Sequence, residues 1–125
     1  MQVRQLMRPQ VWDTFPEECV ADAAERMRDH GVGSLPVVEG EELLGILTER
    51  DVLRAVADGA PLRITPVSAY MTVGAVVASP TADAASAVQL MVQHDVRHLP
   101  IVEDGRLVGM VSARDLLAFD ASRQA

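Results

Sequence analysis

The 125-residue sequence contains no lysine, a single cysteine and few aromatic side chains. Its 11 basic residues are all arginine and are spread along the chain, whereas 18 residues are acidic, so the formal net charge is −7. Binding to duplex DNA depends on clustered positive charge, and binding to single strands depends on aromatic side chains that stack on bases. With one tryptophan, one tyrosine and two phenylalanines, the chain offers little of either. Nucleic acid is therefore not an expected partner.

Long hydrophobic runs are also missing, although a helix needs about 20 consecutive apolar residues to span a membrane. The first residues, MQVRQLMRPQ, lack the apolar core of a signal peptide, so we expect a cytoplasmic protein with no membrane association. Cys19 has no second cysteine with which to form an internal disulfide, which is consistent with a reducing compartment. At 49% hydrophobic residues, the chain has enough apolar surface to fold.

An internal repeat organises the sequence. A shift of 64 positions aligns HGVGSLPVVEGEELLGILTERDVL, which starts at His30, with HDVRHLPIVEDGRLVGMVSARDLL, which starts at His94, without a gap. The repeat predicts one domain over residues 1–60 and a second over 66–121, with a linker at 58–66 and a tail at 122–125. A unit of this size is marginally stable by itself, so we expect the two copies to share an interface.

Both copies show the same order of predicted elements, β-α-β-β-α, so the expected fold class is α+β, a sandwich-like pair of repeats. A short apolar stretch leads to Pro16 or Pro80, where proline suits the first turn of a helix, and Gly31 is placed to end the first helix. Thr48 and Ser112 stand where the N-cap of the last helix belongs. Two strands around a tight turn lie between these helices, over residues 35–38 and 43–47, and over 99–102 and 107–111.

A Gly-x-x-Thr/Ser-x-x-Asp motif joins the last strand to the last helix of each copy. The motif occurs as Gly45–Thr48–Asp51 and as Gly109–Ser112–Asp115. A hydroxyl at the N-cap and the free N–H groups of the first helical turn form a site for an anion. A carboxylate one turn into the helix can accept both hydroxyls of a ribose, and the adjacent Arg50 or Arg114 can reach phosphate oxygens. The two glycines most simply serve close backbone packing.

The chain resembles a tandem pair of CBS domains (a Bateman module), a regulatory module that binds adenine nucleotides. The resemblance covers residues 3–119 and is carried by SLPVVEGEELLGILTERDVL in the first copy and by RHLPIVEDGRLVG and VSARDLL in the second. It implies a stand-alone CBS protein in which the two repeats pack about a pseudo-twofold axis.

The resemblance also implies two nucleotide clefts, each combining the motif of one copy with strands of the other. One cleft would contain Ser112, Arg114, Asp115, Asp13, Gly33, Ser34 and Pro36. Its counterpart would contain Thr48, Arg50, Asp51, Ala75, Val77, Arg97, His98 and Pro100. Asp13 stands where the family often has a threonine, and its charge would repel a phosphate, whereas Arg97 and His98 add positive or titratable groups. The Thr48–Asp51 cleft is therefore the favoured one.

Structural roles stay open for several of these residues. Asp51 and Asp115 could act only on the helix dipole, and Arg50 and Arg114 could be solvated surface residues. The three histidines and the lone cysteine lack the spacing of a zinc site, so we expect no metal. No nucleophile with a base, no pair of catalytic carboxylates and no Walker loop is recognisable, so we expect no enzyme.

The expected function is that of a non-catalytic sensor. It needs no cofactor, binds an adenosine nucleotide of the AMP, ADP or ATP class as a regulatory ligand, and signals to an unknown partner protein. The alternative is a structural dimerisation or protein-interaction module with vestigial clefts. Apolar helix faces around residues 52–56 and 116–119 need a partner, which predicts a homodimer.

Overall fold

The chain folds into two α+β units, and a computed structural model describes residues 1–8 and 10–124, with side chains described as far as residue 118. One unit is continuous and comprises Trp12–Ala75. The other is discontinuous and comprises Met1–Val11 together with Val76–Ala125. The expected α+β class with two repeats is confirmed. In the described part of the chain, no helix has the length and apolar character needed to cross a bilayer.

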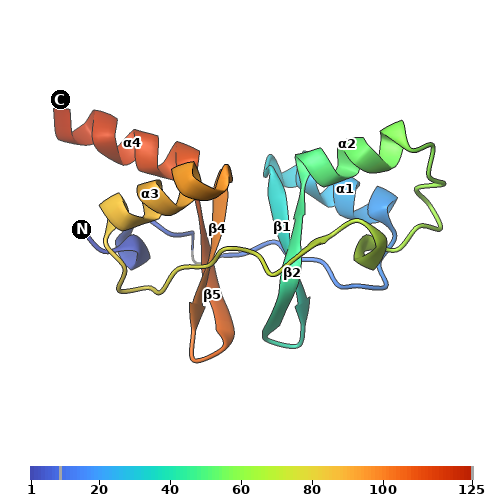
Figure 1. Ribbon diagram of the computed structural model, residues 1–125, viewed down its shortest axis with the longest axis horizontal. Helices are drawn as coiled ribbons and strands as arrows, with labels where there is room; N and C mark the ends of the chain where they lie inside the picture. Colours follow the sequence, from blue (N-terminus) through green and yellow to red (C-terminus); the bar gives the residue numbers. More distant parts are fainter. Residues whose placement is uncertain (9, 125) are drawn as a thin grey trace. The chain divides into compact units, whose positions relative to one another are not determined.

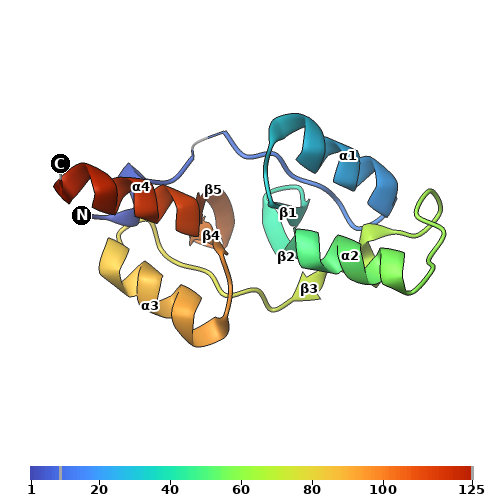
Figure 2. The ribbon, with the colours of Figure 1, turned by 90° about the horizontal axis from the view of Figure 1, so that it is seen from above.

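In the continuous unit, two helices pack with a β-hairpin (Figures 1 and 2). Its elements are α1 (Val20–His30), β1 (Ser34–Glu39), β2 (Glu42–Thr48), α2 (Glu49–Ala57), the 3-10 helix η2 (Val67–Ala69) and β3 (Thr72–Val73). The strand β3 pairs antiparallel with β2, so that Gly45 faces Val73 and Ile46 faces Thr72. Apolar side chains from α1, β1, β2 and η2 form the core cluster, namely Ala23, Met27, Leu35, Val37, Leu47 and Val67.

The discontinuous unit repeats this plan with the N-terminal segment built into it. Its elements are η1 (Val3–Gln5), α3 (Ala84–His94), β4 (His98–Glu103), β5 (Arg106–Ser112) and α4 (Ala113–Gln124). Val3 is fully buried in the core of this unit. The N–H of Val3 donates to the carbonyl of Ala82 at 2.8 Å, and the N–H of Arg8 donates to the carbonyl of Met110 at 2.8 Å. The first eleven residues are therefore part of the unit formed mainly by the second copy.

The sequence repeat and the compact unit are different divisions of the chain. The repeat predicts domains over residues 1–60 and 66–121, whereas packing divides the chain after Val11 and after Ala75. In each copy, the segment that precedes the first helix packs with the other copy. Residues 1–11 pack with the second copy, and residues 67–75 pack with the first, so we call them the exchanged segments. Each unit therefore depends on a short segment that the repeat assigns to the other copy.

The predicted hairpin strands are confirmed to within one or two residues, but the predicted start of each first helix is wrong. Helices α1 and α3 begin at Val20 and Ala84, four residues after Pro16 and Pro80. The carbonyls of both prolines accept hydrogen bonds from the exchanged segments, from Ser68 N–H and from Arg4 N–H respectively, each at 3.0 Å. These bonds hold the chain in a turn where a helix was expected.

The first predicted strand of each copy is reduced to a single bridge. Thr14 pairs in parallel with Val37, and Ala78 pairs in parallel with Ile101. The helix end at Gly31 is confirmed, since Gly31 adopts the left-handed conformation with φ of 62° and its N–H bonds to the carbonyl of Arg28. Asp95 takes the same conformation at the end of α3, with φ of 52°.

Candidate functional site

Each motif forms the same pair of reciprocal hydrogen bonds at a helix N-terminus. In α2, the Thr48 hydroxyl accepts the N–H of Asp51 at 3.2 Å, and the Asp51 carboxylate accepts the N–H of Thr48 at 2.9 Å. In α4, Ser112 and Asp115 form the matching bonds at 3.1 and 2.9 Å. The predicted N-caps are therefore confirmed, and the aspartate completes a capping box with each of them. This arrangement fixes a hydroxyl and a carboxylate together at each helix start.

The motif glycines allow an exchanged segment to lie in close contact with the second hairpin strand, β2 in one unit and β5 in the other. A Cβ built on Gly45 would lie 2.5 Å from the carbonyl oxygen of Thr72, and one built on Gly109 would lie 2.6 Å from the sulfur of Met7. The expected role in close backbone packing is therefore confirmed for both glycines. The passing segment brings Thr72 to one motif aspartate and Arg8 to the other.

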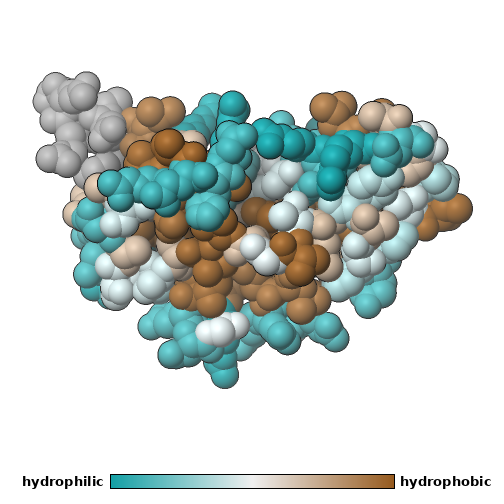
Figure 3. Space-filling view, viewed as in Figure 1, coloured by the Kyte–Doolittle hydropathy of each residue, from teal (hydrophilic) through white to brown (hydrophobic). Residues whose placement is uncertain are grey.

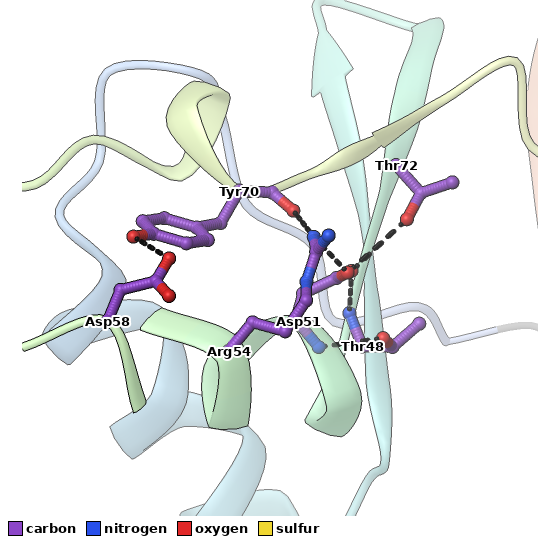
Figure 4. Close-up of polar contacts among 6 residues, drawn as sticks. All are labelled: Thr48, Asp51, Arg54, Asp58, Tyr70 and Thr72. Carbon is purple, nitrogen blue, oxygen red and sulfur yellow. Dashed lines mark hydrogen bonds and ion pairs between the residues drawn. The ribbon is translucent and has the colours of Figure 1, made fainter. Parts of the chain in front are cut away.

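Asp51 is almost completely enclosed by donors (Figure 4). Besides the N–H of Thr48, its carboxylate accepts a hydrogen bond from the Arg54 guanidinium at 2.9 Å. The hydroxyl oxygen of Thr72 lies 3.4 Å from each of the two carboxylate oxygens. Only 6% of the Asp51 side chain is exposed. The carboxylate is thus neutralised and oriented by its own unit.

Arg54 is held from a second side. Its guanidinium also donates to the carbonyl of Tyr70 at 3.1 Å, and the Tyr70 hydroxyl donates to the Asp58 carboxylate at 2.9 Å (Figure 4). The hydrogen bond to Asp58 raises the pKa of Tyr70 above 10, because ionisation of the phenol would lose the proton that it donates. These contacts attach the end of α2 to the segment that precedes β3.

Asp115 has a more open environment than Asp51. Its carboxylate accepts the N–H of Ser112 and lies 3.4 Å from the Arg8 guanidinium, and 16% of its side chain is exposed. The helix residue equivalent to Arg54 is Ala118, which carries no donor in its side chain. The residue equivalent to Thr72 is Arg8. Two substitutions between the copies therefore make the two motif sites unequal.

Several predicted site residues lie beside the motif of their own unit. In the continuous unit, the carbonyl of Gly33 accepts the N–H of Glu49 at 3.1 Å, and Ser34 is the strand partner of Thr48. In the discontinuous unit, the carbonyl of Arg97 accepts the N–H of Ala113 at 2.8 Å, and His98 is the strand partner of Ser112. The start of each first hairpin strand thus lies next to the helix start in the same unit. The predicted pairing of each motif with strands of the other copy stays a prediction.

The remaining predicted residues divide into buried and exposed positions. Pro36 and Pro100 are buried within β1 and β4, where their carbonyls accept the N–H groups of Thr14 and Ala78. The other predicted residues are exposed or half-buried, namely Asp13, Arg50, Ala75, Val77 and Arg114. The two prolines therefore position the strands, and their buried side chains serve the core.

Sequence reasoning missed a partly buried polar network beside Asp13. The Thr14 hydroxyl donates to Glu18 at 2.6 Å, and the Arg26 guanidinium donates to both oxygens of Glu18 at 2.5 and 2.6 Å. Arg26 also donates to the carbonyl of Asp13 at 2.9 Å, which ties the backbone of this candidate residue to α1. Hydrogen bonds from Arg26 hold the pKa of Glu18 below its ordinary value of 4.5. A signal was present, because the second copy has apolar residues at all three equivalent positions, Ala78, Ala82 and Leu90.

The histidine at the end of α1, His30, has an aromatic partner. The rings of His30 and Trp12 stack with centroids 3.5 Å apart and planes within 8°. Among the residues that the structure describes, no three His, Cys, Asp or Glu side chains gather in a way that could hold a metal ion.

Comparison with known proteins gives a consistent family. The sequence profile of the CBS domain matches residues 3–58 and again residues 67–122. The CBS domain-containing protein YhcV of Bacillus subtilis is 41% identical over 123 residues, which cover 98% of this chain and 87% of that protein. A related pair occurs within the inosine-5'-monophosphate dehydrogenase of Korarchaeum cryptofilum, which is 37% identical over 102 residues, or 81% of this chain and 20% of that enzyme.

Solved structures show the same fold. A protein with CBS domains from Burkholderia ambifaria has a TM-score of 0.93 at 30% identity, covering 100% of this chain and 97% of its own. The CBS domain protein PAE2072 from Pyrobaculum aerophilum, complexed with AMP, has a TM-score of 0.87 at 23% identity, covering 98% of this chain and 99% of its own. The chain is thus similar over nearly its full length to proteins with CBS domains.

Proposed function

The chain belongs to the CBS-domain family and contains two copies of the domain, and from this premise we propose that it is a cytoplasmic, non-catalytic regulatory module. Its ligand is an adenosine nucleotide of the AMP, ADP or ATP class, and its output is a change in contact with a partner protein. The ligand alters that contact only to the extent that it binds two conformations or assemblies unequally.

The observation that carries the proposal is the repeated pairing of an N-cap hydroxyl with a fixed carboxylate at the start of α2 and of α4. The first N–H groups of a helix favour a phosphate, and a carboxylate at the same place favours the two hydroxyls of a ribose. Both parts of a nucleoside phosphate therefore have a complementary group at one helix start. The AMP complex of PAE2072 supports the choice of ligand class.

Calorimetric titration with AMP, ADP and ATP tests the proposal directly. We expect binding by the wild type, and we expect Asp51→Asn and Asp115→Asn together to weaken it about tenfold or more, because each change removes charge-assisted hydrogen bonds to the ribose. A 2'-deoxynucleotide should bind the wild type less tightly, and this difference should shrink in the double variant. Asp29→Asn is a matched control, since Asp29 is an exposed carboxylate of α1 outside both motifs.

A comparison of adenine with guanine nucleotides tests whether the protein recognises the base. A ligand that binds only the folded state raises the melting temperature by an amount that grows with the ratio of its concentration to its Kd, so adenine nucleotides should raise it and guanine nucleotides should not. Equal shifts with both bases would contradict the adenosine assignment. No shift and no heat with any nucleotide would leave a protein-interaction module as the function.

A second candidate function is favoured by exposed apolar side chains on α2 and α4. Leu53 and Val56 on α2 are 66% and 55% exposed, and Leu117 on α4 is 68% exposed. Figure 3 shows hydrophobic surface among hydrophilic atoms along the edge formed by α2. Such positions suit contact with another protein, so a structural dimerisation or protein-interaction module is the alternative. The side chain of Phe119, which was predicted to extend the α4 face, lies outside the described residues.

A further inference from the structure

The two motif aspartates differ in how many donors already bind them. Asp51 contacts the N–H of Thr48, the guanidinium of Arg54 and the hydroxyl of Thr72. Within the part of the chain that the structure describes, Asp115 has two contacts, the N–H of Ser112 at 2.9 Å and the Arg8 guanidinium at the longer distance of 3.4 Å. Exposure follows the same order, with 6% for the Asp51 side chain and 16% for that of Asp115.

A ribose needs two acceptor positions on the carboxylate that binds its two hydroxyls. An ionised carboxylate offers about four such positions in all. At Asp51, three donors already fill most of them, and one of the three touches both oxygens. At Asp115, two donors leave room for a pair of hydroxyls, so this carboxylate can accept a ribose without first losing a partner.

Arg54 accounts for the difference in donors between the two aspartates. It is a charged partner of Asp51, and a second hydrogen bond holds its guanidinium in place. An exposed ion pair contributes little to stability when its long side chain loses conformational entropy for that contact alone. Arg54, although 58% exposed, is also bonded to the carbonyl of Tyr70, so its guanidinium is positioned from two sides. Its equivalent in the other copy, Ala118, cannot compete for Asp115.

We propose that Ser112–Asp115 is the primary nucleotide site and that Arg54 keeps Thr48–Asp51 as a latent, weaker site. This inference rests on the proposed function and adds an order of occupancy to it. The order is the reverse of the one suggested by the charges of Arg97 and His98 in the sequence. A nucleotide reaches Asp51 only after Arg54 has turned away, which weakens binding there by about fivefold relative to a site without this arginine. The two sites therefore respond to different nucleotide concentrations.

The first test follows AMP binding to the wild type by amide chemical shifts in 15N-labelled protein. Signals of Ser112 and Asp115 should saturate at lower AMP concentration than those of Thr48 and Asp51. This measurement needs no variant, so it does not depend on whether a changed capping box still folds. Saturation of Thr48 and Asp51 first, or of both motifs together, would overturn the inference.

The second test replaces Arg54 with the residue of the other copy. In Arg54→Ala, the weaker binding event should tighten about fivefold, while the tighter event stays unchanged. Arg28→Ala is the matched control, because Arg28 is an exposed arginine of the same unit paired with Asp29. An unchanged weaker event in Arg54→Ala would refute the role of Arg54. The absence of AMP binding in every protein, wild type included, would instead refute the proposed function.

Discussion

Gly45 and Gly109 show how one residue can serve both packing and a candidate binding site. Neither has a backbone conformation that requires glycine, but each has a neighbour where a Cβ would lie. At Gly45 the neighbour is the backbone carbonyl of Thr72, and at Gly109 the nearest atom is the side-chain sulfur of Met7. A backbone cannot move aside as readily as the end of a methionine side chain.

We therefore expect Gly45→Ala to destabilise the protein by about 1–3 kcal/mol, the usual range for overpacking, and Gly109→Ala to cost less. Urea unfolding followed by circular dichroism gives both values. Gly45→Ala should also free an acceptor position on Asp51, because displacement of β3 moves the Thr72 hydroxyl away from that carboxylate. Equal costs for the two substitutions would show that the backbone of residues 71–73 is free to shift.

At the scale of residues, the sequence predicted the local features and missed those that depend on distant segments. The N-caps Thr48 and Ser112 and the helix end at Gly31 follow from the chemistry of neighbouring residues. The contact between Arg8 and Asp115 joins residues 107 positions apart, and it exists because the N-terminal segment packs in the second unit. No periodicity or spacing in the sequence specifies that pairing.

At the scale of elements, α1 and α3 differ in what lies beside them. A polar network adjoins α1, whereas apolar side chains stand at the equivalent positions around α3. Arg26 of α1 holds Glu18 and the carbonyl of Asp13, whereas the equivalent positions around α3 are Ala78, Ala82 and Leu90. The Glu18 side chain is 9% exposed. Loss of one partner from such a pair leaves the other charge poorly solvated.

The pH dependence of this network has a definite sign. Arg26 lowers the folded-state pKa of Glu18 below 4.5, so the stabilisation is complete above the unfolded value and is lost as the pH falls through the lower folded value. We expect Glu18→Gln to destabilise by about 1.5–3 kcal/mol at pH 7 and the difference from wild type to shrink below pH 4.5. Urea unfolding between pH 7 and pH 3 measures both effects.

The second copy provides the control for that prediction. The triple variant Thr14→Ala, Glu18→Ala and Arg26→Leu introduces the residues of the other copy at all three positions. Replacing a whole buried ion pair by apolar residues is often neutral or stabilising, so the triple variant should be at least as stable as Glu18→Gln at pH 7. A triple variant less stable than Glu18→Gln would show that the network is required by the surrounding core.

The order of elements was predictable, while the beginnings of α1 and α3 were not. The hairpin strands are apolar, β-branched and separated by turn residues, which is a strong local pattern. The prolines at 16 and 80 fit a first helical turn equally well in isolation. Their carbonyls instead bond to Ser68 and Arg4 of the exchanged segments, and this tertiary contact overrides the local preference.

At the scale of the whole molecule, we expect association with a second copy to depend on the exposed faces of α2 and α4. Leu53 and Val56 lie three residues apart on α2 and are both more than half exposed, as is Leu117 on α4. We expect a homodimer formed through these helices, with a mass near twice the 13.5 kDa of one chain by light scattering at micromolar concentration. Leu53→Asp and Leu117→Asp should each shift the protein towards monomer, because a carboxylate is costly to bury in such a contact.

Ile64→Asp is the matched control for the dimer. Ile64 is 78% exposed but lies in the loop between α2 and η2, so the same change of chemistry should leave the mass unchanged. A wild-type mass of one chain, with and without AMP, would contradict the homodimer and would favour a different protein as the partner of these helices.

The discontinuous unit has a consequence for the order in which the protein is made. A ribosome releases residues 12–75 as one uninterrupted stretch, so the continuous unit can fold while synthesis proceeds. Val3, fully buried in the finished protein, must wait for α3, β4 and β5 before it has a core to enter. Val3 thus stays unpacked while the rest of the chain is made, and the entropy of closing so long a loop opposes the late return of the N-terminal segment. A fusion or tag at the first residue would act on the unit that contains Asp115, more than 100 residues further along the chain.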